Sequence, residues 1–203
     1  MKFVLAAGAF ALAATLAAGS AFATTITDTT GFLPQAFYSG PHNGDMDIKS
    51  VSATIDGSDF ILSATLDGPI GTTANAVYVW GVNTGDGTAA FAPEGLTKVL
   101  FNDVVVINPA APAAGVTISG DTVTDIVSIA SLKNEGFSPS QYGFSFWPNL
   151  GAAGNSDFAP DNATFTASAV PEPASWAIML VGFGGLGAVT RHARRKRMTP
   201  GLT

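Results

Sequence analysis

Apolar and polar residues alternate along several short stretches of this chain, and the alternation predicts β-strands. The clearest stretch is 60–66, in which apolar residues occupy every second position from Phe60 to Leu66. The stretch 51–55 precedes it, and the residues between them, Asp-Gly-Ser-Asp at 56–59, are typical of a tight turn. We therefore expect the two stretches to pair as an antiparallel hairpin.

Further stretches of this kind follow at short intervals, separated by turns rich in Gly, Pro, Asn and Asp. The expected strands are 76–82, 98–101 and 104–107 (as a pair or as one bulged strand), 116–119, 122–129, 142–147 and 164–169. No stretch between residues 24 and 170 has a convincing helical period. The sequence thus predicts an all-β domain, a β-sandwich or jelly roll.

The N-terminal residues 1–23 have the plan of a signal peptide. Lys2 is followed by the apolar run 3–18, and Ala21 and Ala23 give small residues around a cleavage point. The alternative is an uncleaved anchor helix, which the Ala21 and Ala23 site disfavours. We expect the mature chain to begin at Thr24.

The C-terminal region has three parts in a fixed order. The Pro-Glu-Pro at 171–173 can neither continue a helix nor join a sheet, so we expect an extended segment. Residues 176–190 carry no charge and would span roughly 22 Å as a helix, against about 30 Å for a bilayer core. We predict a transmembrane helix over 176–190, a cytoplasmic basic stop over 191–197, and a tail end at 198–203. The basic stop contains Arg191, Arg194, Arg195, Lys196 and Arg197.

This C-terminal region resembles a PEP-CTERM sorting tail of the Pro-Glu-Pro-x-x-Trp-Ala variety. The motif positions are Pro171, Glu172, Pro173, Trp176 and Ala177. The resemblance covers residues 171–197 and implies recognition by exosortase, a membrane-embedded protease of Gram-negative bacteria that make exopolysaccharide. Two alternatives remain: a permanent membrane anchor, and a small-residue helix-packing face at Gly182 and Gly185.

Charge and composition narrow the function of the body, residues 24–170. It holds 14 Asp and Glu against three Lys, a net charge of about −11, which argues against nucleic acid or anionic lipid as a partner. The chain has no Cys, so thiol chemistry and disulfides are excluded. It has two His and no Gly-x-Ser-x-Gly motif, and we predict that it is not an enzyme, although spacing alone leaves paired carboxylates open.

One loop has oxygen-bearing residues in an arrangement that suits Ca²⁺. Asn43, Asp45 and Asp47 alternate on a Gly-containing loop, and Asp157 and Asp161 occur later in the chain. The pattern of a twelve-residue helix-loop-helix calcium loop is incomplete. The alternative is that these residues only form turns.

The body also resembles, more loosely, secreted jelly-roll modules of the DOMON and carbohydrate-binding type. The similar features are Gly44-Asp45-x-Asp47-Ile48, Asp56-Gly57, Tyr78-x-Trp80 and the segment 157–161. Haem is not expected, because His42 is the only His of the body.

Aromatic residues on the predicted strands allow two interpretations. They form a platform for a sugar, or they belong to the core. The residues concerned are Tyr78, Trp80, Phe144, Phe146 and Trp147.

The predicted function is that of an exported envelope or matrix protein, sorted by an exosortase-type system and associated with exopolysaccharide or biofilm. The alternative is a carbohydrate- or Ca²⁺-binding jelly-roll module on the same anchor. The expected partners are exosortase, the inner membrane and exopolysaccharide, with no nucleic acid. Calcium is the one cofactor that the pattern allows.

Overall fold

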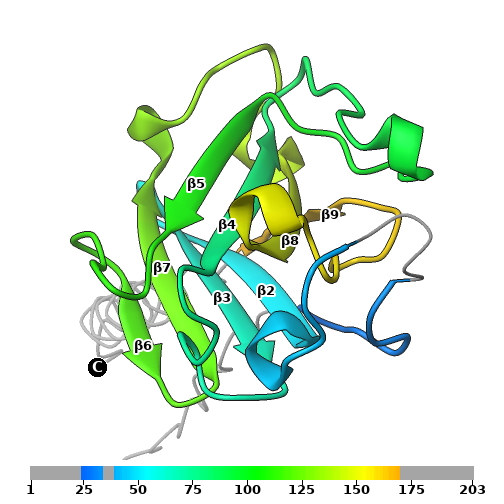
Figure 1. The fold of residues 1–203 in the computed structure, drawn as a ribbon. Helices are drawn as coiled ribbons and strands as arrows, with labels where there is room; N and C mark the ends of the chain where they lie inside the picture. Colours follow the sequence, from blue (N-terminus) through cyan, green and yellow to red (C-terminus); the bar gives the residue numbers. More distant parts are fainter. Residues whose placement is uncertain (1–23, 34–38, 170–203) are drawn as a thin grey trace, which may run out of the picture. The chain divides into compact units, whose positions relative to one another are not determined.

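Two β-sheets make up the body of the chain (Figure 1). The computed structural model describes residues 24–33 and 39–169. The predicted signal peptide and the predicted sorting tail, including its transmembrane helix, lie outside the described residues. Within the described residues, no helix is both long and apolar enough to cross a membrane.

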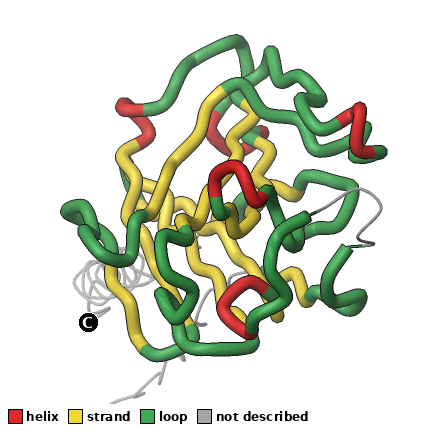
Figure 2. Tube along the Cα trace, in the orientation of Figure 1, coloured by secondary structure: helices red, strands yellow, loops and turns green. Residues whose placement is uncertain are grey.

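Strands dominate the described part of the chain, and its helices are single short turns (Figure 2). The strands are β1 (Thr25–Thr27), β2 (Ile48–Asp56), β3 (Asp59–Leu66), β4 (Val77–Asn83), β5 (Asp103–Ile107), β6 (Thr117–Ser119), β7 (Thr122–Ser128), β8 (Gly143–Asn149), β9 (Phe165–Thr166) and β10 (Ser168–Ala169). The 3-10 helices are η1 (Gly44–Met46), η2 (Ala92–Glu94), η3 (Ile129–Ser131), η4 (Pro139–Gln141) and η5 (Gly151–Ala153). The prediction of an all-β body is confirmed.

The first sheet has the strand order β1-β2-β3-β7-β6, and the short β10 pairs with β2 in parallel. Its other pairs are antiparallel. The predicted hairpin is present: β2 and β3 pair from Asp56 and Asp59 onward, and Gly57 has a φ of 60° that its lack of a Cβ permits. Along β3 every second residue from Phe60 to Leu66 is fully buried, so the alternation of the sequence correctly identified the core face of this strand.

The second sheet has the order β5-β4-β8-β9, all antiparallel. Its central strands β4 and β8 are buried on both faces. One face meets the first sheet, and the other is covered by a second apolar cluster that includes Val79, Leu96, Val99, Trp147 and Phe158. A purely alternating pattern is therefore absent from β4 and β8.

Two predicted strands differ from the structure. Residues 98–101 form no strand beyond an isolated bridge of Phe101 to Thr88, because Val99 instead covers the outer face of the second sheet. The predicted strand 164–169 is split into β9 in the second sheet and β10 in the first. Local alternation cannot show that a chain passes from one sheet to the other.

The main core lies between the sheets and is rich in aromatic rings. Phe60 of β3 meets Phe144 of β8 edge to face with ring centroids 4.9 Å apart, and Trp80 of β4 lies 4.7 Å from Phe146. Truncating one such buried ring to Ala typically costs about 3 to 5 kcal/mol. With no Cys in the chain, this packing supplies the cohesion of the body.

Candidate cation site

The predicted ligand Asp45 lies in a closed hydrogen-bond cluster rather than in an open site. It is 1% exposed. Its carboxylate accepts hydrogen bonds from the Thr73 amide and hydroxyl, both at 2.6 Å, and from the Tyr78 hydroxyl at 3.1 Å. Asn43 donates to the same Thr73 hydroxyl at 2.8 Å. The acceptors of Asp45 are thus occupied by protein donors.

Tyr78 links this cluster to the backbone of the next turn. Its hydroxyl oxygen accepts a hydrogen bond from the Gly71 amide at 3.0 Å. Burial, together with the nearby Asp45 carboxylate, raises the pKa of Tyr78. The hydroxyl therefore stays protonated, and it donates a hydrogen bond to the Asp45 carboxylate.

A different group of acidic residues converges elsewhere in the body. One carboxylate oxygen from each of Asp28, Asp157 and Asp161 lies within 4.8 Å of the other two. Asp28 directly follows β1, whereas Asp157 and Asp161 lie in the loop between β8 and β9. The structure thus unites Asp157 and Asp161, singled out by the sequence, with Asp28, which sequence analysis missed.

Asp157 is the buried member of this group, with 0% exposure. Its two oxygens accept hydrogen bonds from the backbone amides of Ile48 and Phe158, each at 2.8 Å. Burial, and to a lesser extent the Asp28 carboxylate, raises the pKa of Asp157 to about 8. A full negative charge is therefore poorly compensated at this position.

Thr30 connects the other two members. Its amide donates to Oδ1 of Asp28 at 3.0 Å, and its hydroxyl lies 3.2 Å from the same oxygen and 2.5 Å from Oδ1 of Asp161. Oδ2 of Asp28 is buried and has no hydrogen-bond partner. A hydroxyl has one proton to donate, so this group of carboxylates has many more acceptor sites than donors.

The third predicted ligand, Asp47, lies at the margin of this acidic group. Asp28 and Asp47 line the same surface groove of about 550 Å³. Burial raises the pKa of Asp47, and so do the charges of Asp67 and Asp28. Asn43, Asp45 and Asp47 therefore do not meet as one ligand set: the first two belong to the Thr73 cluster, and Asp47 faces the acidic group.

The predicted aromatic platform is part of the core. All five residues are buried, four of them completely and Trp147 to within 4%. Their rings pack against each other and against Phe60, Phe91 and Phe158, so no face is left for a sugar. The core interpretation of these aromatic residues is correct.

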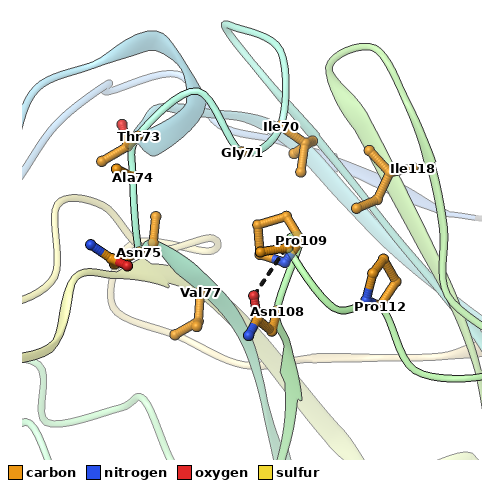
Figure 3. Close-up of a pocket in the computed structure, with 12 residues that line it drawn as sticks. Ile70, Gly71, Thr73, Ala74, Asn75, Val77, Asn108, Pro109, Pro112 and Ile118 are labelled. Atoms are coloured by element: carbon orange, nitrogen blue, oxygen red, sulfur yellow. Dashed lines mark hydrogen bonds between the residues drawn. The ribbon is translucent and has the colours of Figure 1, made fainter.

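A pocket without aromatic lining lies between the loop before β4 and the loop after β5 (Figure 3). Its volume is about 690 Å³. Asn75 and Asn108 bring amide groups to it, and Ile70, Pro109 and Pro112 bring apolar surface. Oδ1 of Asn108 accepts a hydrogen bond from the Ala110 amide at 3.0 Å, which leaves its amide hydrogens available to a ligand.

Comparison with known protein families identifies the C-terminal region. Residues 169–196 match the PEP-CTERM protein-sorting motif. The chain therefore carries a PEP-CTERM sorting motif, and the motif implies export and membrane-anchored sorting by an exosortase-type system. The motif positions 171–177 and the basic stop lie outside the described residues. No curated protein and no solved structure matches the chain significantly.

Proposed function

We propose that this chain is a non-enzymatic protein of the outer envelope or extracellular matrix, delivered by exosortase and associated with exopolysaccharide. The observation that carries the proposal is the sorting motif at 169–196, which begins at the last residue of β10. A β-rich body thus ends where a processing signal begins. The part of the chain that the signal would deliver is the acidic, Cys-free body. Apolar packing stabilises this body, and its net charge favours solubility outside the cell.

Two elements of the tail have different expected roles: the basic stop orients the chain in the membrane, and the Pro-Glu-Pro segment is recognised by the protease. Each cationic side chain costs roughly 2.5 to 3.5 kcal/mol at mid-membrane on insertion scales, so the basic stop opposes passage of the C-terminus. The Pro-Glu-Pro at 171–173 presents Glu172 between two residues of fixed φ, which suits recognition by a protease.

Two variants test this division of labour. Replacing 171–173 by Ala should leave a full-length protein in the inner membrane, as should deletion of exosortase from the host. Replacing the five basic residues by Ser should weaken retention and release unprocessed protein into the periplasm. Cell fractionation with an antibody to the body measures both outcomes. If the wild type stays full length in the inner membrane with or without exosortase, the tail is a permanent anchor and the proposal is wrong.

A second candidate function, carbohydrate binding by the body, is favoured by the pocket of Figure 3. Amide groups beside apolar rings are the kind of surface on which a sugar can both form hydrogen bonds and pack. Binding of exopolysaccharide from the producing strain should weaken in Asn75→Ala and Asn108→Ala, and remain unchanged in Asp86→Asn, an exposed residue outside the pocket. Equal binding of the exopolysaccharide by all of these variants would exclude this pocket as the carbohydrate-binding site.

A further inference from the structure

The outer face of the first sheet carries two rows of hydroxyl side chains that cross the strands β1, β2, β3, β7 and β6. Residues that pair directly across neighbouring strands point to the same side of a sheet. The first row is Thr25, Ser52, Ser63, Thr124 and Thr117. The second row is Thr27, Ser50, Thr65, Thr122 and Ser119. Every position of both hydroxyl rows is therefore Ser or Thr.

The hydroxyl rows face away from the core. Val51, Ala64 and Val123 lie between row positions on three of the strands, and they are at most 1% exposed and belong to the main core. Successive residues of a strand point to opposite faces. In agreement, all ten row residues are exposed or half-buried. The two rows thus form a solvent-facing surface.

This surface is uncharged, although the body around it is acidic. None of the ten row positions carries a charge, whereas the body has a net charge of about −11. Exposed edge strands usually carry charged residues, but the two edge strands here read Thr-Ile-Thr in β1 and Thr-Ile-Ser in β6. Strand propensity accounts for Thr, but it does not account for the four Ser of the rows. The composition of the face therefore points to a polar, uncharged ligand.

The hydroxyls in the middle of the rows are paired across strands and keep capacity for a ligand. Oγ of Ser63 lies 3.2 Å from Oγ1 of Thr124, and Oγ1 of Thr65 lies 3.0 Å from Oγ1 of Thr122. One hydroxyl donates to the other in each pair, so the Ser63 pair keeps one O–H and several lone pairs. The Thr122 hydroxyl also lies 3.2 Å from Oδ1 of Asp121, so the second pair mainly accepts. A ligand that both donates and accepts hydrogen bonds fits these rows.

Apolar carbon borders the hydroxyl rows. Ile61 and Ile126 pair with each other two positions along the strands from the first row, and Ile126 is 53% exposed. Each Thr of the rows adds a methyl group. A sugar unit has hydroxyl groups at its rim and C–H groups on its faces, so this mixture of groups matches it.

The β1 end of the rows is hollowed. Thr25, Thr27, Ser50 and Thr65 line the surface groove of about 550 Å³ described above. Three acids, Asp28, Asp47 and Asp67, line the same groove. Because these acids repel anionic groups, the groove favours uncharged sugar units over acidic ones.

We propose that the two hydroxyl rows bind an extended polysaccharide chain through its uncharged sugar units. Four strand spacings of about 4.8 Å give each row a length of roughly 19 Å, which accommodates several consecutive units. Adjacent strands are rotated by about 20 to 25°, so the rows twist in a way that a single chain can follow and a flat crystalline surface cannot. The inference rests on the polysaccharide association proposed above. It adds a second surface to it, since no row residue lines the pocket of Figure 3.

Binding of exopolysaccharide by the full chain tests the proposal. The protein is purified in detergent, and the probe is exopolysaccharide purified from the producing strain and freed of metal ions with chelator. Co-sedimentation measures the apparent affinity. Because the rows carry no charge, binding should not weaken in about 1 M NaCl, where the Debye length is about 3 Å.

Two double variants remove hydroxyls that bond to each other, so neither partner is left behind. Thr65→Val with Thr122→Val changes the second row, and Ser63→Ala with Thr124→Val changes the first. Each should lower the apparent affinity at least about fivefold, because two hydroxyls are lost to the ligand. Thermal unfolding confirms that each variant is folded, and either pair is sufficient if the other does not fold.

Thr88→Val with Thr97→Val is the matched control, because it changes two exposed threonines outside the rows. It should bind as the wild type does, and an equal loss in this control would overturn the inference. Undiminished binding by both row variants, or binding that is lost in salt, would overturn the inference and leave the polysaccharide association to another surface. No binding by the wild type would overturn both, while the sorting proposal is decided separately by cell fractionation.

Discussion

The buried Asp45 and the group of Asp28, Asp157 and Asp161 lie in the same body but have different hydrogen-bonding environments. Asp45 accepts three hydrogen bonds from Thr73 and Tyr78. Asp28, Asp157 and Asp161 face each other, and Oδ2 of Asp28 has no partner. The oxygens of the first carboxylate are paired with protein donors, whereas the second group brings three carboxylates together with fewer donors.

The difference shows why an acidic residue near a turn is a poor predictor of a metal ligand by itself. A buried carboxylate is stable when donors or a cation satisfy its oxygens. Where neighbouring backbone and hydroxyl groups supply enough donors, as around Asp45, the residue fixes the fold. Where several carboxylates meet with fewer donors, as around Asp28, a bound proton can compensate the charge, and the raised pKa of Asp157 favours one there.

The largest expected effect on stability comes from removing the acceptor of the closed hydrogen-bond cluster around Asp45. Asp45→Ala leaves the Tyr78 hydroxyl and the Thr73 amide buried without an acceptor, and we expect it to lower the free energy of unfolding by about 3 to 4 kcal/mol. The loss should be the same in calcium and in chelator. Chemical denaturation measures it, with Asp86→Ala as the exposed control. A loss that calcium restores would mean that Asp45 belongs to a cation site.

The next effect concerns pH and the acidic group. Because the pKa of Asp157 rises from 3.8 in the unfolded chain to about 8 in the folded one, the folded state binds more protons between these values. In chelator, the free energy of unfolding should therefore fall as the pH rises from about 4 to 8, by on the order of 3 kcal/mol. The raised pKa of Asp47 acts in the same direction.

Denaturation curves at several pH values, with chelator and with calcium, measure this dependence. Asp157→Asn cannot titrate at this position and should flatten the curve. Stability that rises over the same pH range in chelator would contradict the predicted environment of Asp157.

The smallest effect removes one donor from the closed cluster. Tyr78→Phe deletes the hydroxyl that donates to Asp45 and accepts from Gly71. Two other donors to Asp45 remain, so we expect a loss of about 1 kcal/mol. Tyr142→Phe is the matched control, because its hydroxyl makes one bond, to the Lys133 carbonyl at 3.2 Å. If the free energy of unfolding falls by the same small amount in both variants, the Tyr78 hydroxyl stabilises the protein no more than the Tyr142 hydroxyl does.

The sequence by itself determined the local features of this protein. The alternation over 60–66 and the turn at 56–59 specify a strand and a hairpin through neighbouring residues alone. The sorting motif is likewise contiguous, and the family comparison confirms it. Such features are readable because the interactions that define them span a few positions.

Only the tertiary structure decided which acids meet. Asp28 and Asp157 are 129 positions apart in the sequence. They come together because β1, which precedes Asp28, pairs with β2, and because Phe158 in the loop after β8 packs into the second apolar cluster. The same long-range packing buried Trp147 and Asp45, whose local sequences suggested a sugar platform and a metal ligand. The burial of Trp147 and Asp45 and the donors around each carboxylate depend on the whole arrangement of the two sheets, which the residues next to them in the sequence do not encode.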